Sequence, residues 1–397
     1  MRLLFIKDSL TWPRATGHDV HCFHLMQAFA QLGHEVSLAT VVEPNPEALG
    51  SLTLTHRFSL DADTRHDNAA GSLKLTYLQE RFRAYWGIRS DHIIAAGRAA
   101  HACRADVVVA VGLNVLPFLG GIRNALRVWY AADEWVLHHL ALVCWNHPIT
   151  WVHVRAAAIK GLYERVYAPL WDRVWVVSSG DRRAMRGVTG VTAIDRLYSG
   201  VDSDYYLPRE EEERANSCVF WGRLDFDPNI QALQWFCRYV WPLLRKQVPD
   251  AHFRILGFQP CSVVRELAGH DGISLMADLP DIRSEIAHHA VVVLPFHTIG
   301  GVKDKLLEAA SMGKTIVCTP QARGGLRHLR EAPLVLARTS DQWVAKILAL
   351  WADNDRRRRL GLAARRWILK NHTWYAMAQQ AIAALEEHSS PPLRGGD

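Results

Sequence analysis

The chain has 397 residues, of which 49% are hydrophobic and 22% are charged. At roughly 100–200 residues per domain this length indicates two or three domains, and the apolar content excludes a disordered chain. The net charge of +6 suits a nucleic acid, an anionic membrane surface or a phosphorylated substrate, and charge alone does not choose among them.

The seven cysteines are scattered, without a C-x-x-C pair, and several lie inside apolar patterns. Such cysteines are typical of a reducing compartment, where a buried thiol acts as a small hydrophobe. A strand pattern begins directly after Met1, which leaves no cleavable signal, and no apolar run reaches the roughly 18 residues of a membrane span. We therefore expect a cytoplasmic protein, soluble or associated with the inner face of the cell membrane.

The N-terminal half alternates short apolar runs with amphipathic segments, which predicts a parallel sheet covered by helices. A helix is expected after the polar loop at 13–17, ending at Gly33. Strands are expected at 2–6, 35–40, 106–111, 127–130 and 173–178. The pattern predicts a Rossmann-like domain over residues 1–200.

A second alternating series follows the turn-rich stretch 199–204 and the charged run 209–214. Strands are expected at 217–221, 252–256, 273–276, 291–295, 315–318 and 334–337, with helices at 229–246 and 281–289 and helical segments from 340 to 388. We predict an α/β protein in which two Rossmann-like, doubly wound domains, 1–200 and 201–375, face each other across a cleft. Residues 376–397 are expected to form a helix and a frayed tail, with the helix packing back towards the first domain.

The stretch 300–317 has the features of an anion-binding site. An apolar strand runs into a glycine pair that is expected to open a helix with two lysines in its first turn and one glutamate among apolar neighbours. Free amides, the helix dipole and ammonium groups all favour a phosphate or pyrophosphate. A lone Gly-Gly-x-Lys is more often an ordinary turn and a helix with solvated lysines, so the surrounding motifs decide.

These motifs carry a family resemblance. They are the segments 199–202, 220–225 with 228–229, Gly257, Asp278 before Leu279 and Pro280, and 300–317. Their order resembles that of retaining GT-B glycosyltransferases of family 4, especially the sugar transferases of bacterial polysaccharide gene clusters. The similarity covers nearly the whole chain and is strongest from 172 to 330.

The resemblance implies transfer of a hexose from a nucleotide diphosphate sugar to a hydroxyl of a glycan or lipid-linked acceptor, with retention at the anomeric carbon. It implies a UDP or GDP sugar as donor, with no cofactor and no metal. Arg223 and Lys305 would neutralise the diphosphate, while Lys303 is either a second such cation or solvated, and Glu308 would bind the ribose. The donor site implied as a whole is Gly17, Gly222, Arg223, Gly257, Asp278, Leu279, Gly300, Gly301, Val302, Lys303, Asp304, Lys305 and Glu308.

One position departs from the family pattern. The family carries two glutamates, and Gly300 stands near the place of the first, so the identity of the sugar cannot be carried over. A subset of the family shares the Gly-Gly-x-Lys-x-Lys form. The alternatives that remain open are a nucleotide-sugar epimerase and a sugar-nucleotide-binding partner subunit without catalytic activity.

In the N-terminal half, the resemblance places a glycine-containing loop at 13–19 against donor phosphate and acceptor. Gly17 would allow close backbone approach, and His18 and Asp133 are further candidates for the catalytic site. For Asp19 the alternative is a simple helix N-cap. The repeat of His18, His21 and His24 lacks a carboxylate or cysteine partner at ligand spacing, so we expect no metal there.

Two basic clusters remain. The arginines at 356–359 and 365–366 are expected to form a solvated helix face. A second cluster, in which Arg81, Arg83 and Arg89 are mixed with aromatic side chains, is either solvated or a contact with an anionic membrane. No recognisable reading element gathers the basic residues, so no nucleic-acid partner is expected.

Overall fold

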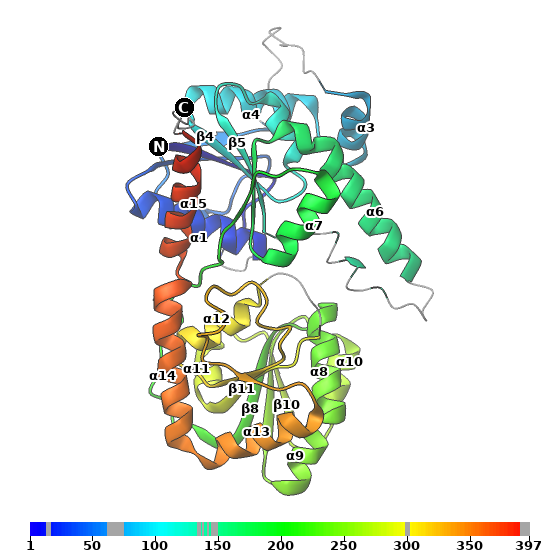
Figure 1. Ribbon diagram of the computed structural model, residues 1–397, viewed down its shortest axis with the longest axis vertical. Helices are drawn as coiled ribbons and strands as arrows, with labels where there is room; N and C mark the ends of the chain where they lie inside the picture. Colours follow the sequence, from blue (N-terminus) through cyan, green and yellow to red (C-terminus); the bar gives the residue numbers. More distant parts are fainter. Residues whose placement is uncertain are drawn as a thin grey trace, which may run out of the picture. The chain divides into compact units, whose positions relative to one another are not determined.

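The computed structural model describes residues 1–12, 17–61, 75–132, 136, 139–140, 143, 150–297 and 302–389. The chain forms two units, each built around its own sheet (Figure 1). The first unit is Met1–Leu197 together with the terminal helix α15 (Trp374–Ser389), and the second is Tyr198–Thr373.

In the first unit the described residues form a seven-stranded parallel sheet in the order β3-β2-β1-β4-β5-β6-β7. Its strands are β1 Arg2–Lys7, β2 Glu35–Thr40, β3 His56–Ser59, β4 Val107–Val111, β5 Leu126–Ala131, β6 Arg173–Val176 and β7 Ile194–Arg196. All five residues of β4 are buried, as expected of a parallel strand that is covered on both faces. The predicted Rossmann-like pattern of this half is confirmed.

The helices of this unit pack around the sheet (Figure 1). They are α1 Gly17–Gln31, α2 Pro46–Gly50, α3 Tyr77–Tyr85, α4 Ser90–Ala102, α6 Thr150–Tyr167 and α7 Ser179–Thr189, with 3-10 turns at Leu116–Gly121 and Ala168–Leu170. The last helix, α15, packs against α1, where the ring of Trp374 stacks on His24 at 5.2 Å. The C-terminal helix therefore returns to the first unit's core.

The second unit contains a six-stranded parallel sheet in the order β10-β9-β8-β11-β12-β13. Its strands are β8 Arg214–Arg223, β9 His252–Phe258, β10 Ile273–Ala277, β11 His289–Leu294, β12 Ile316–Cys318 and β13 Val335–Leu336. Its helices are α8 Asp227–Tyr239, α9 Trp241–Gln247, α10 Ser262–Leu267, α11 Arg283–Ala287, α12 Asp304–Ser311, α13 Ser340–Ala352 and α14 Asn354–Asn371. Two parallel α/β units were predicted, and the structure contains them.

The predicted helix at 229–246 is wrong as a single element. It divides at Val240 into α8 and α9, because Pro242 in the first turn of α9 has no N–H to continue the helical ladder. The predicted helix at 281–289 is also too long. It ends at Ala287, because His289 already belongs to β11.

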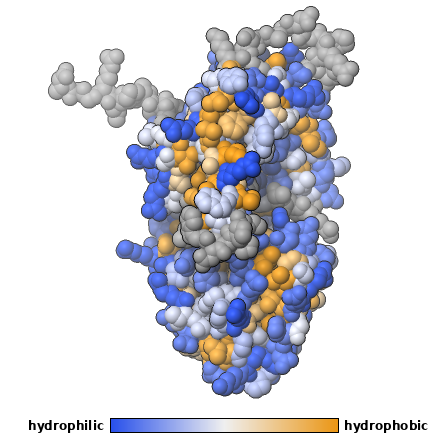
Figure 2. Space-filling model, turned by 90° about the vertical axis from the view of Figure 1, so that its right-hand side faces the viewer, coloured by the Kyte–Doolittle hydropathy of each residue, from blue (hydrophilic) through white to orange (hydrophobic). Residues whose placement is uncertain are grey.

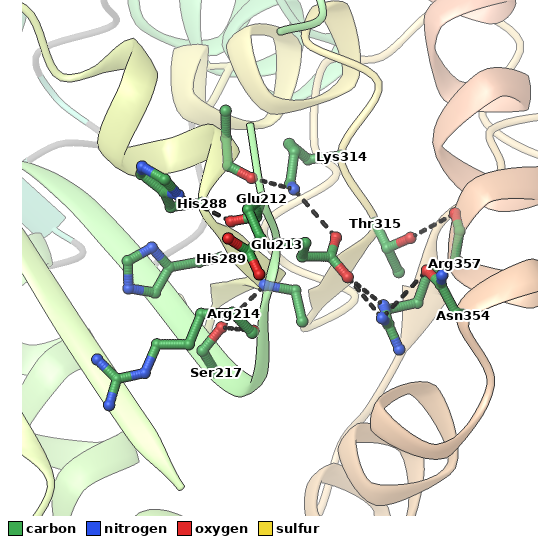
Figure 3. Close-up of polar contacts among 12 residues, drawn as sticks. Glu212, Glu213, Arg214, Ser217, His288, His289, Lys314, Thr315, Asn354 and Arg357 are labelled. Carbon is green, nitrogen blue, oxygen red and sulfur yellow. Dashed lines mark hydrogen bonds and ion pairs between the residues drawn. The ribbon is translucent and has the colours of Figure 1, made fainter. Parts of the chain in front are cut away.

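The prediction of a solvated arginine face on α14 is wrong for two of its members. Arg357 is buried and donates through Nε to Oε1 of Glu213 at 2.9 Å, while Lys314 lies 3.3 Å from the other oxygen of the same carboxylate (Figure 3). Glu213, which precedes β8, therefore links this part of the chain to α14 through Arg357 and to the start of β12 through Lys314. Arg365 donates to the carbonyl oxygens of Ser203 and Tyr206, at 3.1 and 2.9 Å, and so fixes the turn before β8.

Candidate functional site

The candidate site lies at the carboxyl edge of the second unit's sheet. Because β10, β9, β8 and β11 are parallel neighbours, the residues that follow them meet at one edge. Arg223 is the last residue of β8, and Gly257 is the second-to-last residue of β9. Asp278 follows β10, and α12, which contains Lys305, follows β11. Sequence segments more than 80 residues apart, from Arg223 to Lys305, are therefore brought to one edge.

Lys305 is a half-buried cation in the first turn of α12. Its Nζ lies 5.9 Å from the ring centroids of both Phe220 and Phe296, and burial lowers the pKa of its ammonium group while Glu308 opposes that change. No hydrogen bond or ion pair to this ammonium is found within the described residues. An ammonium in such surroundings is a ready receptor for an anion.

Gly222 makes room for this lysine. A Cβ at position 222 would lie 2.4 Å from Cε and 2.6 Å from Nζ of Lys305, so any larger residue would displace the ammonium. The backbone of Gly222 also has φ of +144°, which side-chain-bearing residues rarely adopt. Its neighbour Gly257 is equally constrained, because a Cβ there would lie 1.8 Å from the carbonyl oxygen of Gly222.

Glu308 lies one turn beyond Lys305 and is held by two donors. The indole Nε1 of Trp221 donates to its Oε2 at 2.7 Å, and the hydroxyl of Tyr206 also hydrogen bonds to it. Burial, followed by the charge of Asp304, raises the pKa of Glu308, although both hydrogen bonds and Lys305 act in the opposite direction. The carboxylate therefore has a fixed orientation with one oxygen committed to Trp221.

Arg223 is a second cation at this edge, and it is half exposed. Its Nε lies 2.9 Å from Oδ1 of Asp225, and its carbonyl accepts a hydrogen bond from Asn229 at 2.7 Å. An exposed ion pair of this kind contributes only about 0–1 kcal/mol, so the guanidinium can exchange Asp225 for a ligand at little cost. The hydrogen bond from Asn229 fixes the backbone of Arg223, while its guanidinium can leave Asp225 to bind a ligand.

The other predicted donor residues fall into three groups. The N–H of Asp278 donates to the carbonyl of Gly257 at 2.8 Å, which ties the end of β10 to β9. Leu279 and Val302 are partly buried against the unit's core. Gly300 and Gly301 lie outside the described residues, and α12 begins at Asp304, so the expected opening of the helix by the glycine pair is wrong and Lys303 is the N-cap.

The N-terminal candidates lie in the first unit. Gly17 begins α1, and His18 lies near the end of β4, where a Cβ on Gly112 would lie 3.6 Å from Nδ1 of His18. Asp133 lies outside the described residues. Asp19 lies inside the first turn of α1, not at its N-cap, and forms a buried ion pair of 2.7 Å with Lys7 at the end of β1.

Sequence reasoning missed Trp221 and Tyr206. Trp221 lies two residues before Arg223 in the same strand, so strand alternation indicates that the two share a face. Tyr206 gives no such signal, because it reaches Glu308 only through a turn in which Asp202 accepts the N–H groups of Asp204 and Tyr205.

Known proteins resemble both the fold and this unit. Residues 215–353 match the family model described as Glycosyl transferases group 1, which covers most of the second unit and the whole candidate site except Tyr206. No curated protein matches the sequence. The C-terminal unit therefore carries the sequence pattern of the glycosyltransferase group 1 family.

Solved structures of other proteins show the same architecture over the full length. HepE of Anabaena, solved in complex with UDP and glucose, is 13% identical with a TM-score of 0.65, and the match covers 97% of this chain and 99% of that one. Sucrose-phosphate synthase of Thermosynechococcus elongatus is 15% identical with a TM-score of 0.68, over 98% and 99% of the two chains. TarM of S. aureus, solved as a point mutant with Fondaparinux, alpha-GlcNAc-glycerol and UDP, is 10% identical with a TM-score of 0.67, over 97% and 99%. The protein has the GT-B fold.

Proposed function

We propose that the protein is a retaining glycosyltransferase that moves a hexose from a nucleotide diphosphate sugar to a hydroxyl of a glycan or lipid-linked acceptor. The observation that carries the proposal is the pair of cations, Lys305 and Arg223, beside the fixed carboxylate of Glu308 at one sheet edge. Two cations could neutralise a diphosphate, and a carboxylate can accept hydrogen bonds from ribose hydroxyls.

The proposed donor contacts are those that the family resemblance implies. The diphosphate lies on Lys305 and Arg223, the ribose hydroxyls donate to the carboxylate of Glu308, and the base lies near Gly257 and Asp278. Solved relatives in complex with UDP support uridine as the first base to test, with guanosine as the second. No cofactor and no metal are part of the proposal, because the two cations take the neutralising role.

In the proposed reaction, the bond between the anomeric carbon and the diphosphate oxygen breaks. A bond to the acceptor oxygen forms on the same face of the sugar, and the acceptor proton passes to the departing phosphate oxygen. Lys305 stabilises the negative charge that grows on that phosphate. Electrostatic stabilisation by preorganised charges is usually the largest single contribution to catalysis. We assign the acceptor to the first unit, at Gly17, His18 and Asp133.

We place this reaction in the cytoplasm. Among the described residues, six cysteines are free and five of them are buried, in keeping with a reducing compartment. No helix in the described part of the chain has both the length and the apolar character to cross a bilayer. A lipid-linked acceptor would require contact with a membrane surface.

The test is a binding titration with UDP, GDP and their sugars, followed by product analysis with glycan and lipid-linked acceptors. We expect binding of one nucleoside diphosphate and transfer that requires the acceptor. A donor that is isomerised without any acceptor would show an epimerase instead. Donor binding without turnover by any acceptor would indicate a binding subunit.

A further inference from the structure

Two packed helices of the first unit, α3 and α6, expose large apolar side chains. Tyr77, Tyr85 and Trp151 are each more than 70% exposed, and Val152 and Leu162 are also exposed. Apolar side chains gather over the face of the first unit that Figure 2 turns toward the viewer, the side on which α3 and α6 lie in Figure 1. We call the outward stripes of these helices the α3–α6 face.

Hydrogen bonds and ring packing hold the inner sides of the two helices together. Nε2 of Gln79 donates to the carbonyl of Val166 at 2.9 Å, and the hydroxyl of Tyr167 donates to the carbonyl of Gln79 at 2.6 Å. The ring of Phe82 packs edge-on against Tyr163 at 5.4 Å. These contacts hold the α3–α6 face as a rigid surface.

The structure also corrects the membership of the basic cluster expected at 81–89. Arg83 pairs with Glu80 at 2.7 Å and donates to the carbonyl of Ile88 at 2.6 Å, while Arg89 pairs with Asp61 at 2.8 Å. These two arginines are therefore paired with carboxylates. The sequence cluster did not include α6, which supplies the other half of the face.

The charges that remain on the α3–α6 face are positive. Arg81, Arg155 and Arg165 are exposed, and both helices are described along their whole length. Their two acidic residues do not offset these charges, because Glu80 is paired with Arg83 and Glu164 is fully buried. The face therefore combines exposed tyrosine and tryptophan with uncompensated arginine.

We infer that the α3–α6 face binds an anionic lipid surface. Tyrosine and tryptophan bury their rings at the headgroup level of a bilayer, and arginines beside them contact lipid phosphates. A second copy of the chain fits this face poorly, since an isologous dimer sets the same patch against itself and would oppose its arginines. The inference extends the lipid-linked acceptor of the proposed function, but it is argued from the first unit alone.

The test is flotation of the full chain with vesicles of phosphatidylcholine, with and without phosphatidylglycerol. The double variant Arg155→Glu with Arg165→Glu reverses two charges and should lower binding to the anionic vesicles by about tenfold or more. Each cation near an anionic membrane surface strengthens binding several-fold. Trp151→Ser should lower it as well. Wild-type binding should fall as salt rises, which needs no variant.

Matched controls lie on α14 in the other unit. Arg366→Glu and Leu362→Ser change an exposed arginine and an exposed leucine and should leave flotation unchanged. Equal flotation by the reversed variant and the wild type, equal binding to both vesicle types, or no binding at all would overturn the inference. So would a dimer, seen by light scattering, that Trp151→Ser dissolves. UDP titration of each variant reports on the donor site separately, so failure of one proposal leaves the other readable.

Discussion

The indole nitrogen of Trp221 lies 2.7 Å from Oε2 of Glu308, so a residue near the end of β8 fixes a carboxylate on α12. The two residues are 87 positions apart in the chain, and each comes from an element at the same sheet edge. If Glu308 binds a ribose, this hydrogen bond decides which of its oxygens faces the sugar.

Removing that hydrogen bond should weaken nucleotide binding. We expect Trp221→Phe to lower UDP affinity by roughly tenfold to a hundredfold, because a hydrogen bond to a charged group contributes about 1.5–3 kcal/mol. Trp343→Phe is the matched control, since that indole is equally buried in the second unit but its nitrogen has no hydrogen-bond partner among the described residues. Calorimetric titration of both variants would contradict the account if their affinities changed alike.

Adding one methyl group at position 222 should displace the candidate cation. Gly222→Ala places a Cβ 2.4 Å from Cε of Lys305, and we expect UDP affinity to fall about tenfold or more through loss of a charge-assisted contact. Gly190→Ala is the control for backbone strain, because Gly190 also has positive φ, at +75°, but nothing lies within 4 Å of the added group. Both variants should lose some stability, whereas only Gly222→Ala should lose affinity for UDP.

Glu308 should make stability depend on pH in a defined direction. Its folded pKa is raised above the ordinary 4.5, mainly by burial, so its contribution to stability is present below pH 4.5 and is lost as pH rises through the folded pKa. Each unit of that rise corresponds to about 1.4 kcal/mol. Relative to wild type, Glu308→Gln should therefore gain unfolding free energy as pH increases above 4.5, measured by urea titration. Glu266→Gln, at an exposed position, is the control for the substitution itself.

Glu213 should matter for stability and not for the donor. Glu213→Gln leaves the buried Arg357 and the mostly buried Lys314 without their shared carboxylate, and we expect a loss of about 2 kcal/mol in unfolding free energy, since Glu213 is itself partly exposed. The neighbouring Glu212→Gln is the control, because that side chain is exposed. Equal stability of the two variants would show that the bridge contributes nothing.

The fold was readable from the sequence because apolar runs mark parallel strands. The expected strand at 35–40 coincides with β2, and its five buried residues explain why the pattern is clear. Local signals failed where tertiary contacts decide. The burial of Arg357 depends on Glu213, which lies 144 positions away in the chain. The division of α8 from α9, by contrast, follows from Pro242, a local signal that the predicted single helix overlooked.

The candidate site was predictable where single residues match a family motif. Arg223, Lys305 and Glu308 reach one sheet edge as the resemblance implied. The residues that hold Glu308 were not predictable in this way, because Tyr206 approaches it from a turn fixed by Arg365 on α14. Such contacts join elements that are distant in sequence, and no local spacing records them.

The central claim is that Lys305 binds the diphosphate, and the most direct measurement compares UDP with uridine. Titration of wild type and Lys305→Met with both ligands isolates the contribution of the diphosphate to binding. Methionine keeps the packing of the lysine's aliphatic chain. We expect the preference for UDP over uridine to fall roughly tenfold to a hundredfold in Lys305→Met, as a charged hydrogen bond contributes about 1.5–3 kcal/mol. The exposed Lys370→Met should retain the wild-type preference. An unchanged preference in Lys305→Met would contradict the account.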